Sequence, residues 1–182
     1  MEQSIIIAGF GGQGVLSAGI ILANAFMLND KHVTWYPCYG AEMRGGAVNC
    51  EIVVSDEEVT SVHKKENDIL IALNDLSFNK FLPKVKKNGI VIANETLIEK
   101  KYPRNDVNYI FEKISDIARE LGNVKAANMA ALGILCEICG LVDINCIKQA
   151  IDKVMTSNKA GIKELNYKVL EAAVKECEKQ YE

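Results

Sequence analysis

The stretch Ile5 to Val15, IIIAGFGGQGV, decides the fold expected for this chain. Its first residues, Ile5 to Ile7, are β-branched and predict a strand. A glycine-rich turn follows, and the apolar segment from Val15 to Leu28 predicts a helix directly after it. Glycine lets the backbone turn sharply and leaves N–H groups at the helix start open to an anion such as phosphate. The residues predicted to form this phosphate-binding turn are Gly9, Gly11, Gly12, Gln13 and Gly14.

The glycine spacing leaves other interpretations open. Gly9, Gly11 and Gly14 match GxGxxG, the pattern of dinucleotide-binding turns. Such folds hold the ribose with an Asp or Glu at the end of the second strand. This chain has Pro37-Cys38-Tyr39 there, and Asp30 precedes that strand, so ordinary NAD binding is disfavoured. A tight turn that needs glycine only for packing is the second alternative.

The composition limits the class of protein. A length of 182 residues is typical of one domain, expected to span 1–182, and is sufficient for a full core. The net charge of −3, without long blocks of one sign, disfavours a nucleic-acid partner. The uncharged run between Glu2 and Asp30 is interrupted by glycines and polar residues, which excludes a spanning helix, and Met1-Glu2-Gln3 lacks the basic start of a signal peptide. We therefore expect a cytoplasmic protein without membrane contact, whose six cysteines are reduced.

Strand and helix patterns alternate along the chain. Beyond the first strand and helix, strands are expected over 31–36, 47–55, 68–73, 90–93 and 107–111. Helices are expected from an N-cap at Asp75 or Ser77 to Lys87, from an N-cap at Ser115 or Asp116 to Gly122, and over 125–139, 144–155 and 162–178. The run 68–73 is continuously apolar, as in a strand covered on both faces. This order predicts an α/β fold, a Rossmann-like three-layer domain with a mainly parallel sheet and a helical C-terminal layer.

A second motif follows the expected second strand. The segment 39–46, YGAEMRGG, places an acid and a guanidinium two residues apart between glycines. A planar guanidinium suits phosphate or carboxylate, and flanking glycines permit a close backbone approach. An exposed Glu42–Arg44 contact within a surface loop is the alternative. The candidate ligand or interface residues of this loop are Tyr39, Gly40, Glu42, Arg44, Gly45 and Gly46.

The remaining reactive side chains favour structural roles. Cys136-Glu137-Ile138-Cys139 is a CxxC, but it lies in an apolar helical run without further ligands at matching spacing, so a metal or cluster site is not expected. His32 starts a strand and His63 lies in a charged turn, where neither is placed as a general base. The chain has no GxSxG, Walker or HExxH pattern, so no catalytic residue is predicted.

Taken together, GFGGQGV at 9–15 and VTWYPCYGAEMRGGAVNCEIVVSD at 33–56 resemble the gamma subunit of 2-oxoacid:ferredoxin oxidoreductases. ELGN at 120–123, Asn128 and Leu132-Gly133 extend the resemblance, while 57–120 matches mainly by pattern. The second stretch is most similar to the 2-oxoglutarate type. Cys38 stands where the family commonly has serine, and Ala41 where proline is common.

The resemblance implies a single pyruvate/ketoisovalerate oxidoreductase gamma-type domain. It implies participation in the oxidative decarboxylation of 2-oxoglutarate to succinyl-CoA and CO2, with ferredoxin reduced. Coenzyme A would contact this chain, while thiamine diphosphate, magnesium and iron–sulfur clusters belong to partners. Those partners would be alpha, beta and ferredoxin-like delta subunits, with ferredoxin as acceptor and this chain inactive alone. Asn128 would contact the residues that bind the ligand, and not the ligand itself.

Four alternatives remain open from the sequence. The first is a free-standing oxidoreductase using NAD or a flavin, which the missing acid disfavours. The second is a purely architectural subunit whose glycine turn is conformational. The third keeps the family but changes the oxoacid to indolepyruvate or a branched-chain compound. The fourth concerns assembly: an uncovered apolar interface would allow the isolated chain to form a homodimer.

Overall fold

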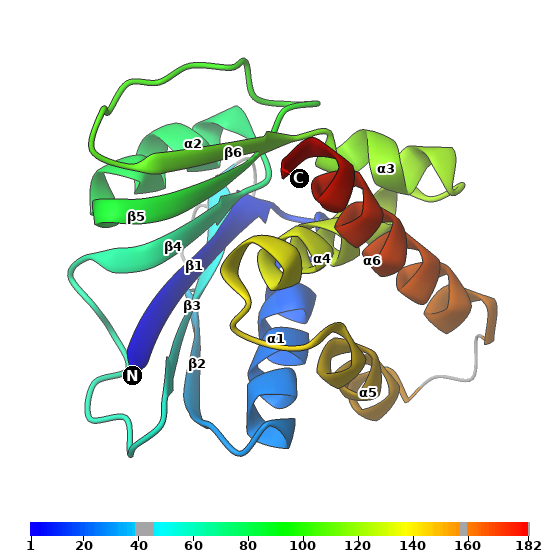
Figure 1. The fold of residues 1–182 in the computed structure, drawn as a ribbon, viewed down its shortest axis with the longest axis horizontal. Coiled ribbons are helices and arrows are strands. Elements are labelled where there is room, and N and C mark those ends of the chain that lie inside the picture. The colour runs from blue at the N-terminus through cyan, green and yellow to red at the C-terminus, as the bar shows by residue number, and fades with distance from the viewer. Residues whose placement is uncertain (39–45, 157–159, 182) are drawn as a thin grey trace.

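The computed structural model describes residues 1–38, 46–156 and 160–181. Six strands form one sheet in the order β2-β3-β1-β4-β5-β6 (Figure 1). Neighbours β1, β4, β5 and β6 are parallel, whereas β3 runs antiparallel to both β1 and β2. The connection from β2 to β3 is too short for a crossover helix, so the chain returns antiparallel. The strands span Glu2–Phe10, His32–Cys38, Ala47–Ser55, Asn67–Ala72, Val85–Asn94 and Asn108–Glu112 for β1 to β6.

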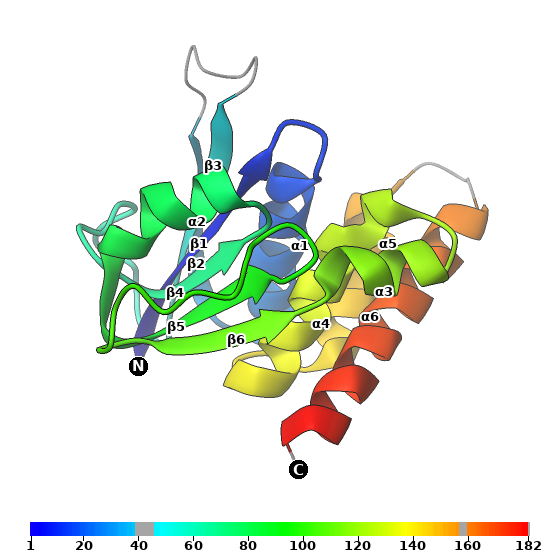
Figure 2. The same ribbon diagram turned by 90° about the horizontal axis from the view of Figure 1, so that it is seen from above.

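Helices cover both faces of the sheet, which confirms the predicted α/β architecture (Figure 2). On one face, Ile5 and Ile7 of β1 share a core with α1, α3, α4, α5 and α6. On the other face, Ile6 and Ala8 pack with α2. Alternate side chains of a strand point to opposite faces, and helices cover both faces of this sheet. Ile5, Ile6 and Ile7 are therefore all buried. The helices span Val15–Leu28, Asp75–Phe81, Ile114–Glu120, Ala127–Cys139, Ile144–Val154 and Ala160–Tyr181 for α1 to α6.

The C-terminal helices form the expected additional layer, in which α6 packs on α4 (Figure 2). Gly133 of α4 faces the backbone of α6, and a Cβ at this position would lie 2.5 Å from the carbonyl oxygen of Leu170. The two helices therefore approach as closely as their backbones allow. This approach explains why a glycine occupies the middle of a buried helix in spite of its low helix propensity.

The helix predicted to run to Lys87 ends earlier. α2 stops at Phe81, a short 3₁₀ turn, η2, covers Leu82–Lys84, and β5 already begins at Val85. Pro83 has no N–H to continue the helical bonds, so the chain leaves the helix there. Asn88-Gly89, expected to close the helix, instead lies inside β5, where Asn88 has a φ of 63°.

The predicted caps of two helices were also wrong. The N-cap of α2 is Asn74, whose side chain accepts a hydrogen bond from the Ser77 N–H at 2.9 Å, rather than Asp75 or Ser77 itself. The N-cap of α3 is Lys113, whose side chain makes no capping hydrogen bond within the part of the chain that the structure describes. Ser115 bonds instead to Asn94, a residue 21 positions away, which the local sequence could not indicate.

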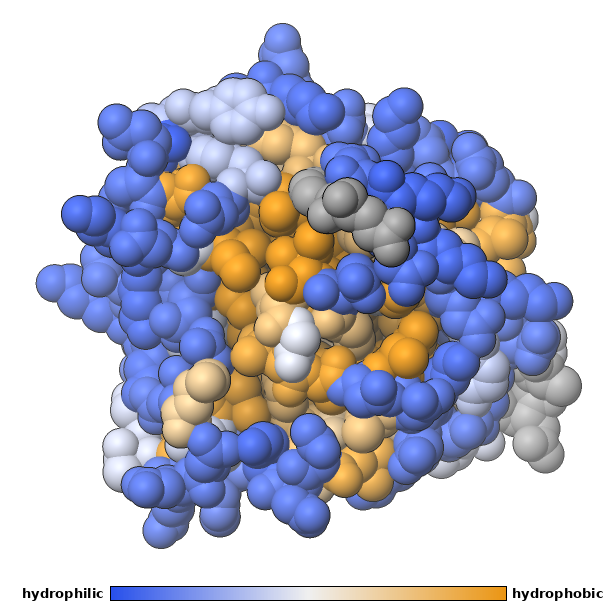
Figure 3. Space-filling model, viewed as in Figure 1, coloured by the Kyte–Doolittle hydropathy of each residue, from blue (hydrophilic) through white to orange (hydrophobic). Residues whose placement is uncertain are grey.

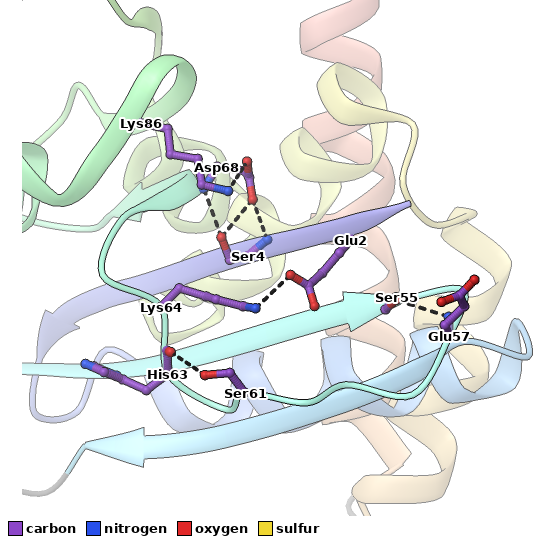
Figure 4. A network of polar contacts seen from close by, with 9 residues as sticks. All are labelled: Glu2, Ser4, Ser55, Glu57, Ser61, His63, Lys64, Asp68 and Lys86. Carbon is purple, nitrogen blue, oxygen red and sulfur yellow. Dashed lines mark hydrogen bonds and ion pairs between the residues drawn. The ribbon is translucent and has the colours of Figure 1, made fainter.

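The charged segment between β3 and β4 is fixed to the sheet by polar contacts (Figure 4). Lys64 pairs with Glu2 at 2.7 Å, and the Ser61 hydroxyl donates to the His63 carbonyl at 2.8 Å. His63 also lies over the sheet, where its Nδ1 is 2.6 Å from an oxygen of Glu51, a carboxylate only 3% exposed. The mostly exposed histidine thus partners a buried acid, which is a structural role.

In the same region, Asp68 of β4 connects the starts of three neighbouring strands, β1, β4 and β5 (Figure 4). One of its oxygens accepts from the N–H and hydroxyl of Ser4 at 2.8 and 2.7 Å, and the other accepts from Lys86 at 2.8 Å. Burial opposes ionisation of this carboxyl, yet the hydrogen bonds from Lys86 and Ser4 outweigh it and lower its pKa below the usual value.

Candidate functional site

The glycine turn lies at the carboxyl end of β1, between two neighbouring strand ends. Gly12 and Gly14 have φ values of +93° and +70°, which L side chains rarely adopt. The Gln13 N–H donates to the Phe10 carbonyl at 3.2 Å and closes the turn. The predicted strand, glycine turn and helix are therefore all present, and α1 has the predicted bounds.

The glycines serve different physical purposes. A Cβ on Gly9 would lie 2.8 Å from the Gln13 side-chain oxygen and 2.9 Å from a Val15 methyl, so this position is closed by packing. A Cβ on Gly14 would lie 2.5 Å from the Asn128 amide nitrogen. At Gly12, by contrast, no atom of the described residues lies within 4 Å of such a Cβ. Packing thus accounts for Gly9 and Gly14, whereas the outer side of Gly12 is open.

The start of α1 has the electrostatic character of an anion site. Its N-cap is Gly14, no side chain in the described part of the protein caps it, and its first turn contains no acidic residue. The first N–H groups of a helix have no intrahelical partners and carry partial positive charge. With an open glycine turn in front of them, these N–H groups can receive a phosphate without a side chain in between.

The Gln13 side chain turns into the protein rather than toward the open side of the turn. Its oxygen accepts from the Phe10 N–H at 2.6 Å and from the Asn74 amide at 2.9 Å. Its nitrogen donates to the Leu73 carbonyl at 3.3 Å. The amide of Gln13 is thus engaged by the protein itself, and only the backbone of this residue faces the turn.

Asn128 supports the turn from behind, from the first turn of α4. The residue is 6% exposed, and its amide donates to the Gly14 carbonyl at 3.1 Å. The structure therefore brings Asn128 to the glycine turn, 114 positions away in sequence.

The base of the second motif lies beside the glycine turn. Phe10 of β1 pairs with Ala47 of β3, and Gly9 pairs with Val48. This register places Gly46 next to the first residues of the turn. The other candidates in this loop lie outside the described residues: Tyr39, Gly40, Glu42, Arg44 and Gly45.

Two asparagines at neighbouring strand ends were not predicted as site residues. Asn74 follows β4 and Asn94 ends β5, and they are 2% and 0% exposed. The Asn94 amide donates to the Leu73 carbonyl at 3.1 Å, the same oxygen that Gln13 contacts. The available signal was an asparagine directly after each apolar strand, at the edge where such sheets bind ligands.

Of the cysteine pair of α4, Cys136 is part of the core and Cys139 is half-buried and packs against it. Burial raises the pKa values of Cys136 and Cys139 to about 12, so both thiols stay protonated at neutral pH. Within the described ranges, no group of three or more His, Cys, Asp or Glu side chains is arranged to hold a metal ion. No helix in the same ranges is long and apolar enough to cross a membrane.

An apolar hollow lies at the opposite end of the strands. Figure 3 shows apolar side chains gathered in the middle of the face between the sheet and the helices. A cavity of about 300 Å³ there is lined by Ile90, Ile138 and Leu141 together with charged residues that include Asp68 and Lys86. Because it lies near the strand starts, it is separate from the glycine turn.

The mixed sheet and the glycine turn that opens α1 define a Rossmann-like α/β domain. The chain belongs to the pyruvate ferredoxin/flavodoxin oxidoreductase family, whose model matches residues 4–176.

The relatives of the chain carry the names of different oxoacids. It is 38% identical to the ketoisovalerate oxidoreductase subunit VorA of Methanothermobacter marburgensis, covering 100% of this chain and 38% of that protein. It is 39% identical to the 2-oxoglutarate synthase subunit KorC of Archaeoglobus fulgidus, covering 77% of this chain and 72% of that one. The chain thus spans little more than a third of VorA. Two different oxoacids appear in these names, so the relatives share a class of reaction and differ in substrate.

Solved structures agree with this placement. The gamma subunit of a keto/oxoacid ferredoxin oxidoreductase from Geobacter sulfurreducens matches with a TM-score of 0.82 and 27% identity, over 95% of this chain and 96% of that one. The 2-oxoglutarate:ferredoxin oxidoreductase of Magnetococcus marinus has the same fold at 21% identity, with a TM-score of 0.85 over 96% of this chain and 31% of that one. The resemblance to gamma subunits is confirmed.

Proposed function

We propose that this chain is the gamma subunit of a multi-subunit 2-oxoacid:ferredoxin oxidoreductase of the 2-oxoglutarate type. In that complex it holds the phosphates of coenzyme A and packs against the catalytic subunits. The observation that carries the proposal is the open, uncapped glycine turn at the start of α1. The backbone N–H groups of Gly11, Gly12 and Gly14 are the groups assigned to the pyrophosphate.

The sequence has no Asp or Glu at the end of the second strand to bind a ribose, and this fits coenzyme A better than NAD. The ribose of coenzyme A carries a 3′-phosphate, so an acidic residue beside it would be repulsive rather than helpful. The solved Magnetococcus enzyme is described with 2-oxoglutarate, coenzyme A and succinyl-CoA bound, and one part of it has this fold. The loop 39–46, whose base lies beside the glycine turn, would supply Arg44 to the same ligand or to the subunit interface.

The remaining chemistry belongs to partner chains. Alpha, beta and ferredoxin-like delta subunits would hold thiamine diphosphate, magnesium and iron–sulfur clusters, and ferredoxin would accept the electrons. Thiamine diphosphate supplies the electron sink for decarboxylation when it is bound. The role of this chain is to present the coenzyme A thiol at the catalytic subunits by fixing the distant phosphates.

The 2-oxoglutarate assignment is supported by the resemblance of residues 33–56 and by the similarity to KorC. The assembled enzyme would be assayed with 2-oxoglutarate, 2-oxoisovalerate and indolepyruvate under anaerobic conditions. A higher kcat/KM for 2-oxoglutarate supports the assignment. A preference for 2-oxoisovalerate would instead place the chain with VorA.

Gly12→Val tests the coenzyme A site in the assembled enzyme. Branched methyl groups would fill the open side of the turn, and a φ of +93° would no longer be accessible without strain. We expect the KM for coenzyme A to rise about tenfold or more, since binding weakens by at least about 1.4 kcal/mol. Gly122→Val is the matched control, because Gly122 has a φ of +95° and no neighbour within 4 Å among the described residues. An unchanged KM for Gly12→Val in an intact complex refutes the site.

Two further experiments separate the alternatives. Titration of the purified chain with NADH would show tight binding if the chain were a free-standing dinucleotide enzyme. Arg44→Ala should weaken either assembly or coenzyme A use. If Gly12→Val and Arg44→Ala both leave coenzyme A kinetics unchanged while the chain still copurifies with larger subunits, the subunit is purely architectural.

The apolar hollow is the surface we assign to subunit packing. Residues such as Ile138 and Leu141 line it beside the charged Asp68 and Lys86, and apolar side chains gathered on one face are normally covered by protein. Isolated from its partners, the chain is expected to form a homodimer through it. Light scattering of the purified chain measures this, and a strictly monomeric chain at high concentration would exclude it.

A further inference from the structure

A chain of amide side chains, two of them buried, lies directly behind the glycine turn and joins three neighbouring strand ends. Its members are Gln13 after β1, Asn74 after β4 and Asn94 at the end of β5. Gln13 and Asn74 share a direct hydrogen bond of 2.9 Å, while Gln13 and Asn94 both donate to the Leu73 carbonyl. Asn94 continues the chain to the hydroxyl of Ser115 in α3 at 2.8 Å.

The geometry points to Asn74 as a positioning residue for coenzyme A, acting on the glycine turn through Gln13. This inference rests on the proposed function. Asn74 does not reach the open side of the turn; its amide donates to the Gln13 oxygen, and that oxygen accepts the Phe10 N–H at 2.6 Å. Asn74, which follows β4, therefore fixes the orientation of the Gln13 side chain. Through its bond to the Phe10 N–H, this side chain fixes the backbone before and within the glycine turn.

The donor and acceptor assignments are fully determined by this arrangement. The Gln13 nitrogen faces a carbonyl, so its oxygen must face the two donors, the Phe10 N–H and the Asn74 amide. The Asn74 oxygen accepts from the Ser77 N–H at 2.9 Å, which leaves its nitrogen for Gln13. One asparagine thus connects the cap of α2 with the glycine turn. Loss of the Asn74 donor would leave the Gln13 side chain held only by the Phe10 N–H and the Leu73 carbonyl, so its orientation would be less firmly fixed.

Asn74→Ser separates the two roles of this residue. A serine hydroxyl caps a helix about as well as asparagine does, so the start of α2 is retained. The hydroxyl is too short to reach Gln13, and no charge is introduced near the ligand phosphates. Asn123→Ser is the matched control, because Asn123 caps a short 3₁₀ turn, η3 (Val124–Ala126), by accepting from the Lys125 N–H at 3.0 Å.

The test is the kinetics of the assembled enzyme under anaerobic conditions. For Asn74→Ser we expect the KM for coenzyme A to rise about threefold to tenfold, the effect of one hydrogen bond. The kcat at saturating coenzyme A and the KM for the oxoacid should stay at wild-type values, which a general folding defect would not spare. Hydrogen exchange of the peptide covering residues 5–15 should be faster in Asn74→Ser than in Asn123→Ser.

A second variant keeps the inference falsifiable. Gln13→Met has nearly the same length and removes the bond to Asn74 together with the bonds to Phe10 and Leu73, so it replaces Asn74→Ser, with an equal or larger expected effect, should that variant fail to assemble. If both act through one bond, the double variant raises the KM for coenzyme A no further than the larger single change. Additive effects overturn the inference.

The three variants separate the positioning role of Asn74 from the coenzyme A site itself. If Gly12→Val raises the KM for coenzyme A while Asn74→Ser and Gln13→Met leave it unchanged, the site stands and the positioning role is wrong. If Gly12→Val has no effect, the coenzyme A site itself is wrong, and the positioning role falls with it.

Discussion

Replacing Gly14 by alanine is expected to destabilise the protein in two separable ways. The first is backbone strain, because a φ of +70° costs an L residue about 1 to 2 kcal/mol, partly offset by about 0.4 to 1 kcal/mol from the stiffer unfolded chain. The second is a clash, since the new methyl would lie 2.5 Å from the Asn128 amide nitrogen. Asn128 must move and lose its hydrogen bond to the Gly14 carbonyl, worth about 1 kcal/mol, with a further penalty for burial without a partner.

Gly140→Ala isolates the strain term. Gly140 is the C-cap of α4 and has a φ of +58°, and a methyl group added there would meet no atom of the described residues within 4 Å. We expect a loss of unfolding free energy of about 1 kcal/mol for Gly140→Ala and about 2 to 3 kcal/mol for Gly14→Ala.

Urea denaturation of the purified variants, followed by far-UV circular dichroism, measures these losses. The double variant Gly14→Ala with Asn128→Ala should lose about 1 kcal/mol less unfolding free energy than the two single variants lose together. In the double variant the new methyl group no longer meets the Asn128 amide. Equal losses for Gly14→Ala and Gly140→Ala would refute the claim that Asn128 packs against the turn.

Other consequences concern the sheet and the thiols. His63→Ala should lower the unfolding free energy by about 1 kcal/mol or less, because it removes the 2.6 Å contact between a mostly exposed imidazole and the buried Glu51 carboxylate; an unchanged or increased stability in a urea titration would contradict that contact. The lowered pKa of Asp68 stabilises the fold above the ordinary aspartate pKa of about 4, and this contribution is lost as the pH falls through the lower folded pKa. The stability gap between wild type and Asp68→Asn should therefore close on acidification, and a gap independent of pH would count against the contacts of Asp68. Burial raises the pKa of Cys136 to about 12, so at pH 8 an aromatic disulfide should label this thiol much more slowly in the folded protein than in the urea-unfolded chain, as peptide mapping would show; equal rates would contradict the buried placement of Cys136.

The proposed site divides its tasks between backbone and side chains. Backbone N–H groups of the glycine turn face the ligand, and side chains such as Gln13, Asn74 and Asn128 face inward and hold that backbone. A site built in this way tolerates little change in glycine φ values, yet it needs no charged residue in contact with the turn. This division agrees with a subunit that binds a substrate and leaves the redox chemistry to its partners.

Local patterns in the sequence were sufficient for much of the fold. The continuous apolar strands and the glycine turn predicted a mainly parallel sheet and the bounds of α1, because burial on both faces and positive φ values leave direct marks on residue choice. The resemblance carried by the glycine turn and residues 33–56 identified the family. The helix predicted to reach Lys87 ends at Phe81, because Pro83 has no N–H to continue the helical hydrogen bonds.

Only the tertiary structure decided how distant residues meet. Register pairs Phe10 with Ala47 and so places the base of the second motif beside the first. Asn74 and Asn128 reach the glycine turn from 61 and 114 positions away along the chain, where no periodicity links them to it. Which way an amide side chain points depends on the donors and carbonyls that neighbouring strand ends bring to it. The sequence by itself determined that a glycine turn opens a helix, while tertiary contacts decided that Gln13 faces inward.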